Sequence, residues 1–309
     1  NKWNFFFSVY ALRRVGIFPT IGLNHTILTT IARAAVPFAL SGIFVRVYSY
    51  IDTVLLQHMR GDLEVGWYSV PYKITYAFQF IPMALSAALF PALSAAWKQD
   101  RARMGWVFGR ALRYSILLVL PITFGIAALA PEIILTVYGK EFINSIVPLE
   151  ISIFGLVFMF LYFPVGALLN STDRQRANTV FMGITMAVNI LFNLFLIPRF
   201  GAVGASIATL ITNAFLWLGT LLWAMRITPL PTGIVSTGIK SLVAASAMAL
   251  VVLEGKHLAP WPLSILAGAL VYGVCIWALR AITREDFLEF TKLFRKLSPS
   301  ADSSNQQST

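Results

Sequence analysis

Three ionisable residues lie inside long apolar stretches of this chain: Arg46, Asp52 and Lys73. A charge at bilayer depth costs several kcal/mol unless it is paired or hydrated, so such residues are the strongest functional evidence in the sequence. At about 1.5 Å per helical residue, Asp52 lies roughly 8 Å and Lys73 about 9 Å inside the outer ends of two consecutive helices. We therefore predict an Asp52–Lys73 ion pair that holds a helical hairpin, with Tyr48 and Tyr76 one turn away as further partners.

Arg46 is predicted to lie near the middle of its span, about 120° around the helix from Asp52. Tyr50 and Thr53 lie on the same polar and aromatic face. A guanidinium fork matches the oxygens of a phosphate or an acidic sugar. Two interpretations stay open: a cavity cation that meets an anionic ligand, and an arginine bonded to carbonyls or to an acid on a helix outside this sequence.

A pair of asparagines, Asn189 and Asn193, stands four residues apart on a later apolar stretch, with Met182 and Met186 on the same face. Polar side chains inside membrane helices commonly hydrogen-bond a neighbouring helix. We favour that interpretation over a role in substrate binding.

The elements that must position these residues are membrane-spanning helices. The 309 residues are 58% hydrophobic and 12% charged, far from the roughly one quarter charged residues of soluble domains. A hydrocarbon core about 30 Å thick needs about 20 helical residues to cross it. On this basis we place eight spans near residues 34–57, 67–93, 111–134, 146–169, 179–197, 202–223, 241–253 and 263–279.

Basic residues give the chain an orientation. Of its 24 Lys and Arg residues, 18 fall in or at the edge of every second polar segment, with the two ends of the chain counted as segments. By the positive-inside rule, both ends of the chain are predicted to be cytoplasmic. The net charge of +11 then lies beside anionic lipid headgroups, which attract each cation by about 1 kcal/mol, so we expect membrane lipids and no nucleic acid as partners.

The sequence offers no pattern for catalysis or for a cofactor. His25, His58 and His257 stand apart from one another, and Cys275 is the single cysteine. Phosphate-binding loops and zinc-spaced Cys or His sets are absent from the sequence, and no connector is long enough for a soluble catalytic module. We therefore expect no enzyme, no metal and no cofactor. Because the chain begins with Asn1 and shows no signal-peptide pattern, we expect it to begin within a longer protein.

Four separated motifs, in this order, resemble the polysaccharide-biosynthesis flippases. These belong to the multidrug, oligosaccharidyl-lipid and polysaccharide exporter superfamily, and the O-antigen (Wzx-like) branch is the nearest resemblance. Together the motifs cover about residues 30 to 280. They are a helical hairpin with YIDTVLL at 50–56, EVGWYSVPYKI at 64–74 and LFPALS at 89–94, then VYGKEF at 137–142, LNSTDR at 169–174 and IPRFGAVGASIA at 197–208.

The resemblance implies an all-α integral membrane protein: a bundle of about eight transmembrane helices that forms the C-terminal lobe of a two-lobe flippase. Such a transporter of the inner membrane would move an undecaprenyl-diphosphate-linked oligosaccharide to the periplasmic leaflet by alternating access, for O-antigen or exopolysaccharide assembly. Its implied partners are the lipid-linked glycan, the N-terminal lobe missing from this chain, and polysaccharide polymerase or glycosyltransferase machinery. A lipid II flippase and a multidrug or cation exporter of the same superfamily remain alternatives.

The same resemblance implies two groups of site residues. Arg46, Tyr50 and Thr53 are candidates for the substrate cavity, and Asp52, Lys73 and Tyr76 for coupling or gating. Neither the sugar nor the coupling ion, proton or sodium, follows from the match.

Four regions are expected along the chain. Residues 1–33 form an inter-lobe linker with a truncated N-terminal region, and residues 34–280 form the transmembrane bundle. Residues 281–297 place Phe287, Phe290 and Phe294 at helical spacing beside basic residues, which predicts an amphipathic helix on the cytoplasmic membrane surface. Residues 298–309 are polar and small, which predicts a disordered tail.

Overall fold

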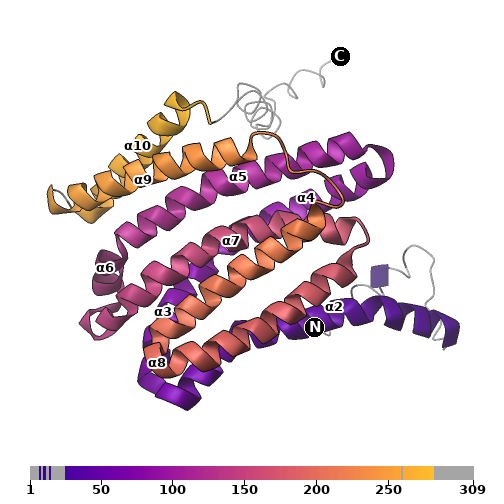
Figure 1. The fold of residues 1–309 in the computed structure, drawn as a ribbon, viewed down its shortest axis with the longest axis horizontal. Helices are drawn as coiled ribbons and strands as arrows, with labels where there is room; N and C mark the ends of the chain where they lie inside the picture. The colour runs from indigo at the N-terminus through magenta and orange to yellow at the C-terminus, as the bar shows by residue number, and fades with distance from the viewer. Residues whose placement is uncertain (1–6, 8–9, 12–13, 15–24, 259, 282–309) are drawn as a thin grey trace.

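The computed structural model describes residues 7, 10, 11, 14, 25–258 and 260–281, and these are drawn as ribbon in Figure 1. The described part is a bundle of helices without β-strands. Its elements are α2 (His25–Arg60), α3 (Asp62–Phe78), α4 (Phe80–Gln99), α5 (Arg101–Ala128), α6 (Ala130–Ile133), a π-helical turn (Ile134–Tyr138), a 3₁₀ turn (Lys140–Ser145), α7 (Ile146–Ser171), α8 (Gln175–Ala224), α9 (Ile234–Leu258) and α10 (Trp261–Ala278).

Five of the eight predicted spans, 34–57, 146–169, 179–197, 202–223 and 241–253, each lie within one helical element. The span 67–93 crosses from α3 into α4, the span 111–134 runs from α5 through α6 to the π-helical turn, and the span 263–279 ends one residue beyond α10. Six helical stretches in the described residues are long and apolar enough to cross a membrane. One of them, the 50-residue α8, folds back on itself and so supplies two passes, and the 36-residue α2 is a further long helix. The all-α membrane bundle expected from the sequence is confirmed.

The fold-back in α8 occurs at Gly201, whose backbone has φ 55° and ψ −131°. Residues with a Cβ rarely adopt this conformation. Contacts between the two limbs are symmetric about this point: the Asn189 amide nitrogen donates to Thr212 Oγ1 at 3.4 Å, and the rings of Phe181 and Trp223 lie 6.5 Å apart. The motif at 197–208 is thus the tip of a helical hairpin, visible beside the α8 label in Figure 1.

Two of the other family-like motifs, at 137–142 and 169–174, also lie where helices begin or end. Gly139, with φ 88°, separates the π-helical turn from the 3₁₀ turn that leads into α7. The hydroxyl of Thr172 donates to the Leu168 carbonyl at 2.8 Å as α7 ends, and Asp173 follows with φ 59°. Chain reversals restrict residue type more strongly than apolar helix surfaces do, which explains why the motifs lie there.

Helix α7 occupies the centre of the bundle, between α8 on one side and α5 and α4 on the other (Figure 1). Its buried side chains include Leu149, Ile153, Leu156 and Phe160, each fully buried. α2 packs on α8 at one edge of the bundle, while α9 packs on α5 and α10 on α9 at the opposite edge. The large exposed apolar side chains on the outer helices are those expected of a lipid-facing surface.

Helix α2 begins at His25, so the last residues of the region 1–33 are helical. Most of residues 1–24, and the amphipathic helix and tail predicted beyond residue 281, lie outside the described residues.

Candidate functional site

Asp52 lies at the junction of four helical segments. Its side chain is 5% exposed, and its carboxylate accepts hydrogen bonds from Tyr68 of α3 at 2.9 Å, Asn193 of the first α8 limb at 2.6 Å and Thr209 of the second limb at 2.6 Å. Tyr68 and Thr209 also lie 3.2 Å apart, oxygen to oxygen. The carboxylate therefore joins α2 to α3 and to both limbs of the α8 hairpin.

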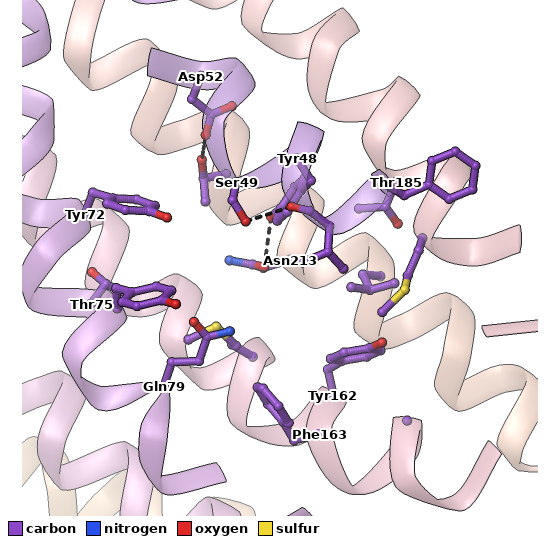
Figure 2. A pocket seen from close by; sticks show the side chains of 18 of the residues that line it. Tyr48, Ser49, Asp52, Tyr72, Thr75, Gln79, Tyr162, Phe163, Thr185 and Asn213 are labelled. Carbon is purple, nitrogen blue, oxygen red and sulfur yellow. Dashed lines mark hydrogen bonds between the residues drawn. The ribbon is translucent and has the colours of Figure 1, made fainter. Parts of the chain in front are cut away.

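The network continues along the same helices. Tyr48, one turn before Asp52, donates to the amide oxygen of Asn213 at 3.0 Å, as Figure 2 shows, and lies 3.3 Å from Thr212. Asn189 reaches Thr212 from the opposite limb. The interhelical hydrogen bonding predicted for Asn189 and Asn193 is confirmed, and the partner of Asn193 is Asp52 itself.

The charge of Asp52 has no basic partner among the described residues. All three of its hydrogen-bond partners are neutral, and two buried amide oxygens nearby, those of Asn189 and Asn193, have no hydrogen-bond partner. Carboxylate, amide and hydroxyl oxygens are the donor set that suits a hard cation. A buried carboxylate in this setting can be neutralised by a proton or by such a cation.

The predicted Asp52–Lys73 ion pair is wrong. Lys73 is exposed, and Tyr68 takes the place on α3 opposite Asp52. At 100° per residue, Lys73 lies about 140° around α3 from Tyr68, which explains why the lysine faces away from the carboxylate. The predicted hairpin does form, but a tyrosine–carboxylate hydrogen bond joins its two helices.

A cavity of about 420 Å³ opens beside this network, lined by α2, α3, α4, α7 and α8. Figure 2 shows Tyr72, Gln79, Tyr162 and Asn213 projecting toward it. Asp52 contributes to its wall, and no Lys, Arg or His is among the described residues of the lining. The volume falls within the range of about 300–1,000 Å³ that is typical of ligand pockets.

The other predicted site residues occupy different places. Tyr76 lines the cavity and stacks on Tyr72, with ring centroids 5.8 Å apart. Arg46, Tyr50 and Thr53 do share one face of α2, as predicted, but none of them lines this cavity. Arg46 and Tyr50 are exposed, because the opposite face of α2 packs on α8.

A second polar cluster joins the tips of two hairpins. Arg60, at the end of α2, donates to the carbonyl oxygens of Ile197 at 3.2 Å and Pro198 at 2.7 Å. Glu64, in the first turn of α3, accepts a hydrogen bond from the backbone N–H of Ala202 at 2.7 Å. The Arg60 cation thus lies at the C-terminal end of the first α8 limb, and the Glu64 anion lies at the N-terminal end of the second limb. Both charges interact favourably with the helix dipoles, because a helix is partly negative at its C-terminus and partly positive at its N-terminus.

Sequence reasoning missed several members of the site, above all Tyr68, Thr209 and Asn213. One signal was present: Tyr68, Tyr72 and Tyr76 recur every four residues on one helix face. Thr209 and Asn213 repeat the same spacing within an otherwise apolar limb of α8. Such polar stripes in apolar spans indicate a surface turned toward other helices or toward a cavity.

Comparison with known proteins adds independent evidence. The family model described as "Polysaccharide biosynthesis protein" matches residues 4–147. The chain is 30% identical over 295 residues to "Probable flippase AglR" of Haloferax volcanii, and the match covers 88% of this chain and 60% of that protein. It is 25% identical over 219 residues to "Putative O-antigen transporter" of Shigella dysenteriae, covering 68% of this chain and 53% of that protein. The chain therefore spans little more than half the length of these relatives.

Solved structures share the fold. "Lipid II flippase MurJ, inward closed conformation" matches 90% of this chain and 57% of that chain, with a TM-score of 0.66 and 15% identity. An outward-facing multidrug resistance MATE family transporter of the MOP superfamily matches 85% of this chain and 67% of that chain, with a TM-score of 0.54 and 17% identity. At these identities the likeness concerns the fold alone.

Proposed function

Because this chain belongs to the polysaccharide-biosynthesis flippase family, we propose that it is the C-terminal lobe of a two-lobe transporter for an undecaprenyl-diphosphate-linked oligosaccharide. Transport would run from the cytoplasmic to the periplasmic leaflet of the inner membrane, with both ends of this chain cytoplasmic. The basic connectors support the orientation. Polysaccharide polymerase or glycosyltransferase machinery would supply and consume the glycan on the two sides.

One observation supports transport above all: a buried carboxylate that has no basic partner among the described residues joins α2, α3 and α8 beside a cavity. A network that holds α2, α3 and α8 through one titratable group changes strength when that group gains or loses a proton or a cation. Asp52 is therefore the proposed coupling group. Tyr76 and Lys73 lie on α3, which the network ties to α2, so movement of α3 would carry them along as gating residues.

Arg46, Tyr50 and Thr53 have a different proposed role. Their shared face of α2 is turned away from the cavity and from α8. In a two-lobe transporter this face would meet the path of the substrate between the lobes, where a guanidinium could contact the diphosphate. The lipid tail would meanwhile stay in the bilayer, because only the polar head needs a hydrated route.

A second candidate function is cation export by the same fold. It is favoured by one observation: the only carboxylic or basic side chain in the described cavity wall is an acid, Asp52. Such a wall attracts a cation and repels an anion. The relatives named flippase and O-antigen transporter weigh against it.

Liposomes that hold the full-length protein test the two functions side by side. A fluorescent undecaprenyl-diphosphate oligosaccharide reports flipping, and ethidium reports cation export. We expect the wild type to flip the lipid-linked glycan, with flipping lost in both Asp52→Asn and Arg46→Ala. Ethidium transport without glycan flipping would reject the flippase and favour the exporter.

A further inference from the structure

The cavity beside Asp52 has an unusual wall for a protein that handles a diphosphate. Its volume is about 420 Å³, and five helices contribute to it. No described lining residue is a lysine, arginine or histidine, while Asp52 supplies a carboxylate. Phosphate groups are normally held by Arg and Lys, and burying an anion without such partners is costly. The cavity is therefore poorly suited to the diphosphate end of a lipid-linked glycan.

Aromatic rings form much of this wall. Tyr72 and Tyr76 stack at 5.8 Å between centroids with an angle of 20° between their planes, and Tyr68 lies 6.5 Å from Tyr72. Tyr48 and Tyr162 line the cavity from α2 and α7. Pyranose rings present apolar C–H faces, which pack well against aromatic rings, and tyrosine adds a polar hydroxyl at the edge of each ring.

The remaining polar groups suit hydroxyl groups. Gln79 and Asn213 offer amides that both donate and accept hydrogen bonds, as sugar hydroxyls do. Thr185, whose side chain is 2% exposed, also lines the cavity, and its buried hydroxyl has no hydrogen-bond partner. A buried polar atom without a partner is costly, and a bound hydroxyl would satisfy it.

From this combination we propose that the cavity is a saccharide subsite, which takes uncharged sugar residues of the transported glycan and leaves the diphosphate outside. The inference rests on the proposed flippase function and divides the substrate between two places. The sugar enters the aromatic and amide-lined cavity, while the anionic group stays where cations can reach it. The saccharide end is then recognised next to the coupling carboxylate, because Tyr48 and Asp52 belong both to the hydrogen-bond network and to the cavity wall.

Saturation-transfer difference NMR on the full-length protein in nanodiscs tests this directly. The probes are neutral methyl glycosides of glucose, galactose and N-acetylglucosamine, with sodium glucuronate, sodium diphosphate and ethidium as charged comparisons. We expect the neutral glycosides to receive saturation and the two anions neither to receive it nor to displace them. Loss of one stacked ring in Tyr72→Ala should weaken glycoside binding roughly three- to tenfold, and Tyr72→Phe should stay within about twofold.

Two further variants complete the experiment. Gln79→Ala removes an amide that lines the cavity and should weaken glycoside binding by about two- to tenfold. Phe80→Ala is the matched control. Phe80 follows Gln79 directly in the chain, but its side chain is 66% exposed and does not line the cavity. Equal binding in Tyr72→Ala, Gln79→Ala and Phe80→Ala would overturn the subsite, as would displacement of the glycosides by diphosphate or ethidium.

The flipping assay separates this inference from the function on which it rests. Flipping by the wild type combined with unchanged binding in the cavity variants rejects the saccharide subsite and keeps the flippase. Absence of flipping by correctly reconstituted protein rejects the flippase, whatever the glycosides do. Flipping that falls in Tyr72→Ala and Gln79→Ala in step with glycoside binding, and persists in Phe80→Ala, supports both.

Discussion

Substitution of Asp52 separates the structural role of its carboxylate from its proposed role in coupling. In Asp52→Ala, the donors on Tyr68, Asn193 and Thr209 all lose their acceptor inside the bundle. Each orphaned buried donor costs about 1–3 kcal/mol. Tyr68 and Thr209 already lie 3.2 Å apart and can pair with each other. That pairing leaves two donors without an acceptor, so we expect a net loss of about 2–6 kcal/mol.

Asp52→Asn keeps the volume and one acceptor oxygen but cannot carry a charge. One donor of the network is left without an acceptor, which costs the variant about 1–3 kcal/mol. Part of this loss is offset because the variant no longer has to bury a charged carboxylate. We expect its stability to remain within about 2 kcal/mol of wild type, while flipping is lost because neither a proton nor a cation can be exchanged.

Thermal unfolding of the detergent-solubilised full-length protein, read beside the flipping assay, checks both variants. At roughly 2–4 °C per kcal/mol, Asp52→Ala should lower the apparent Tm by about 10 °C. Asp62→Ala is the matched control, because Asp62 is an exposed acid on the adjoining helix whose carboxylate accepts from Gln57 at 3.0 Å. Wild-type flipping by Asp52→Asn would refute the coupling role, and an unchanged Tm in Asp52→Ala would refute the energetic argument.

Four other variants test the remaining contacts by the same Tm measurement. Glu64→Gln weakens the charge-assisted bond to the start of the second α8 limb and should cost about 1–2 kcal/mol, a cost that an unchanged Tm would contradict. Gly201→Ala should cost at least about 1–2 kcal/mol, because its φ of 55° disfavours a Cβ and that Cβ would meet the Glu64 carboxylate; a stabilised variant would contradict this. Lys73→Ala should change stability by less than about 0.5 kcal/mol since the lysine is exposed, and a large loss would revive the discarded ion pair. Phe160→Ala, at a fully buried position on α7, should cost about 3–5 kcal/mol, and a loss below 1 kcal/mol would show that α7 is not the packed centre.

The amino-acid sequence by itself determined the class of this protein and the rough position of every span. Apolar stretches of about 20 residues have to be helical in a bilayer, since only internal hydrogen bonds satisfy the backbone there. The gaps left between the predicted spans at residues 135–145 and 198–201 contain Gly139 and Gly201, which adopt positive φ values in the structure. Asn189 and Asn193 indicated an interhelical contact, and that contact forms.

Only the tertiary structure decided which polar residues meet. Asp52 lies 141 residues from Asn193 and 157 from Thr209, and nothing local in the chain links them. The rotation of each helix about its axis is set by how side chains pack between helices, not by hydropathy. That rotation places Tyr68 instead of Lys73 opposite the carboxylate and turns Arg46 away from α8. Tyr68 and Lys73 lie about 140° apart around α3, so the carboxylate beside the cavity accepts hydrogen bonds from neutral donors and does not form the predicted ion pair.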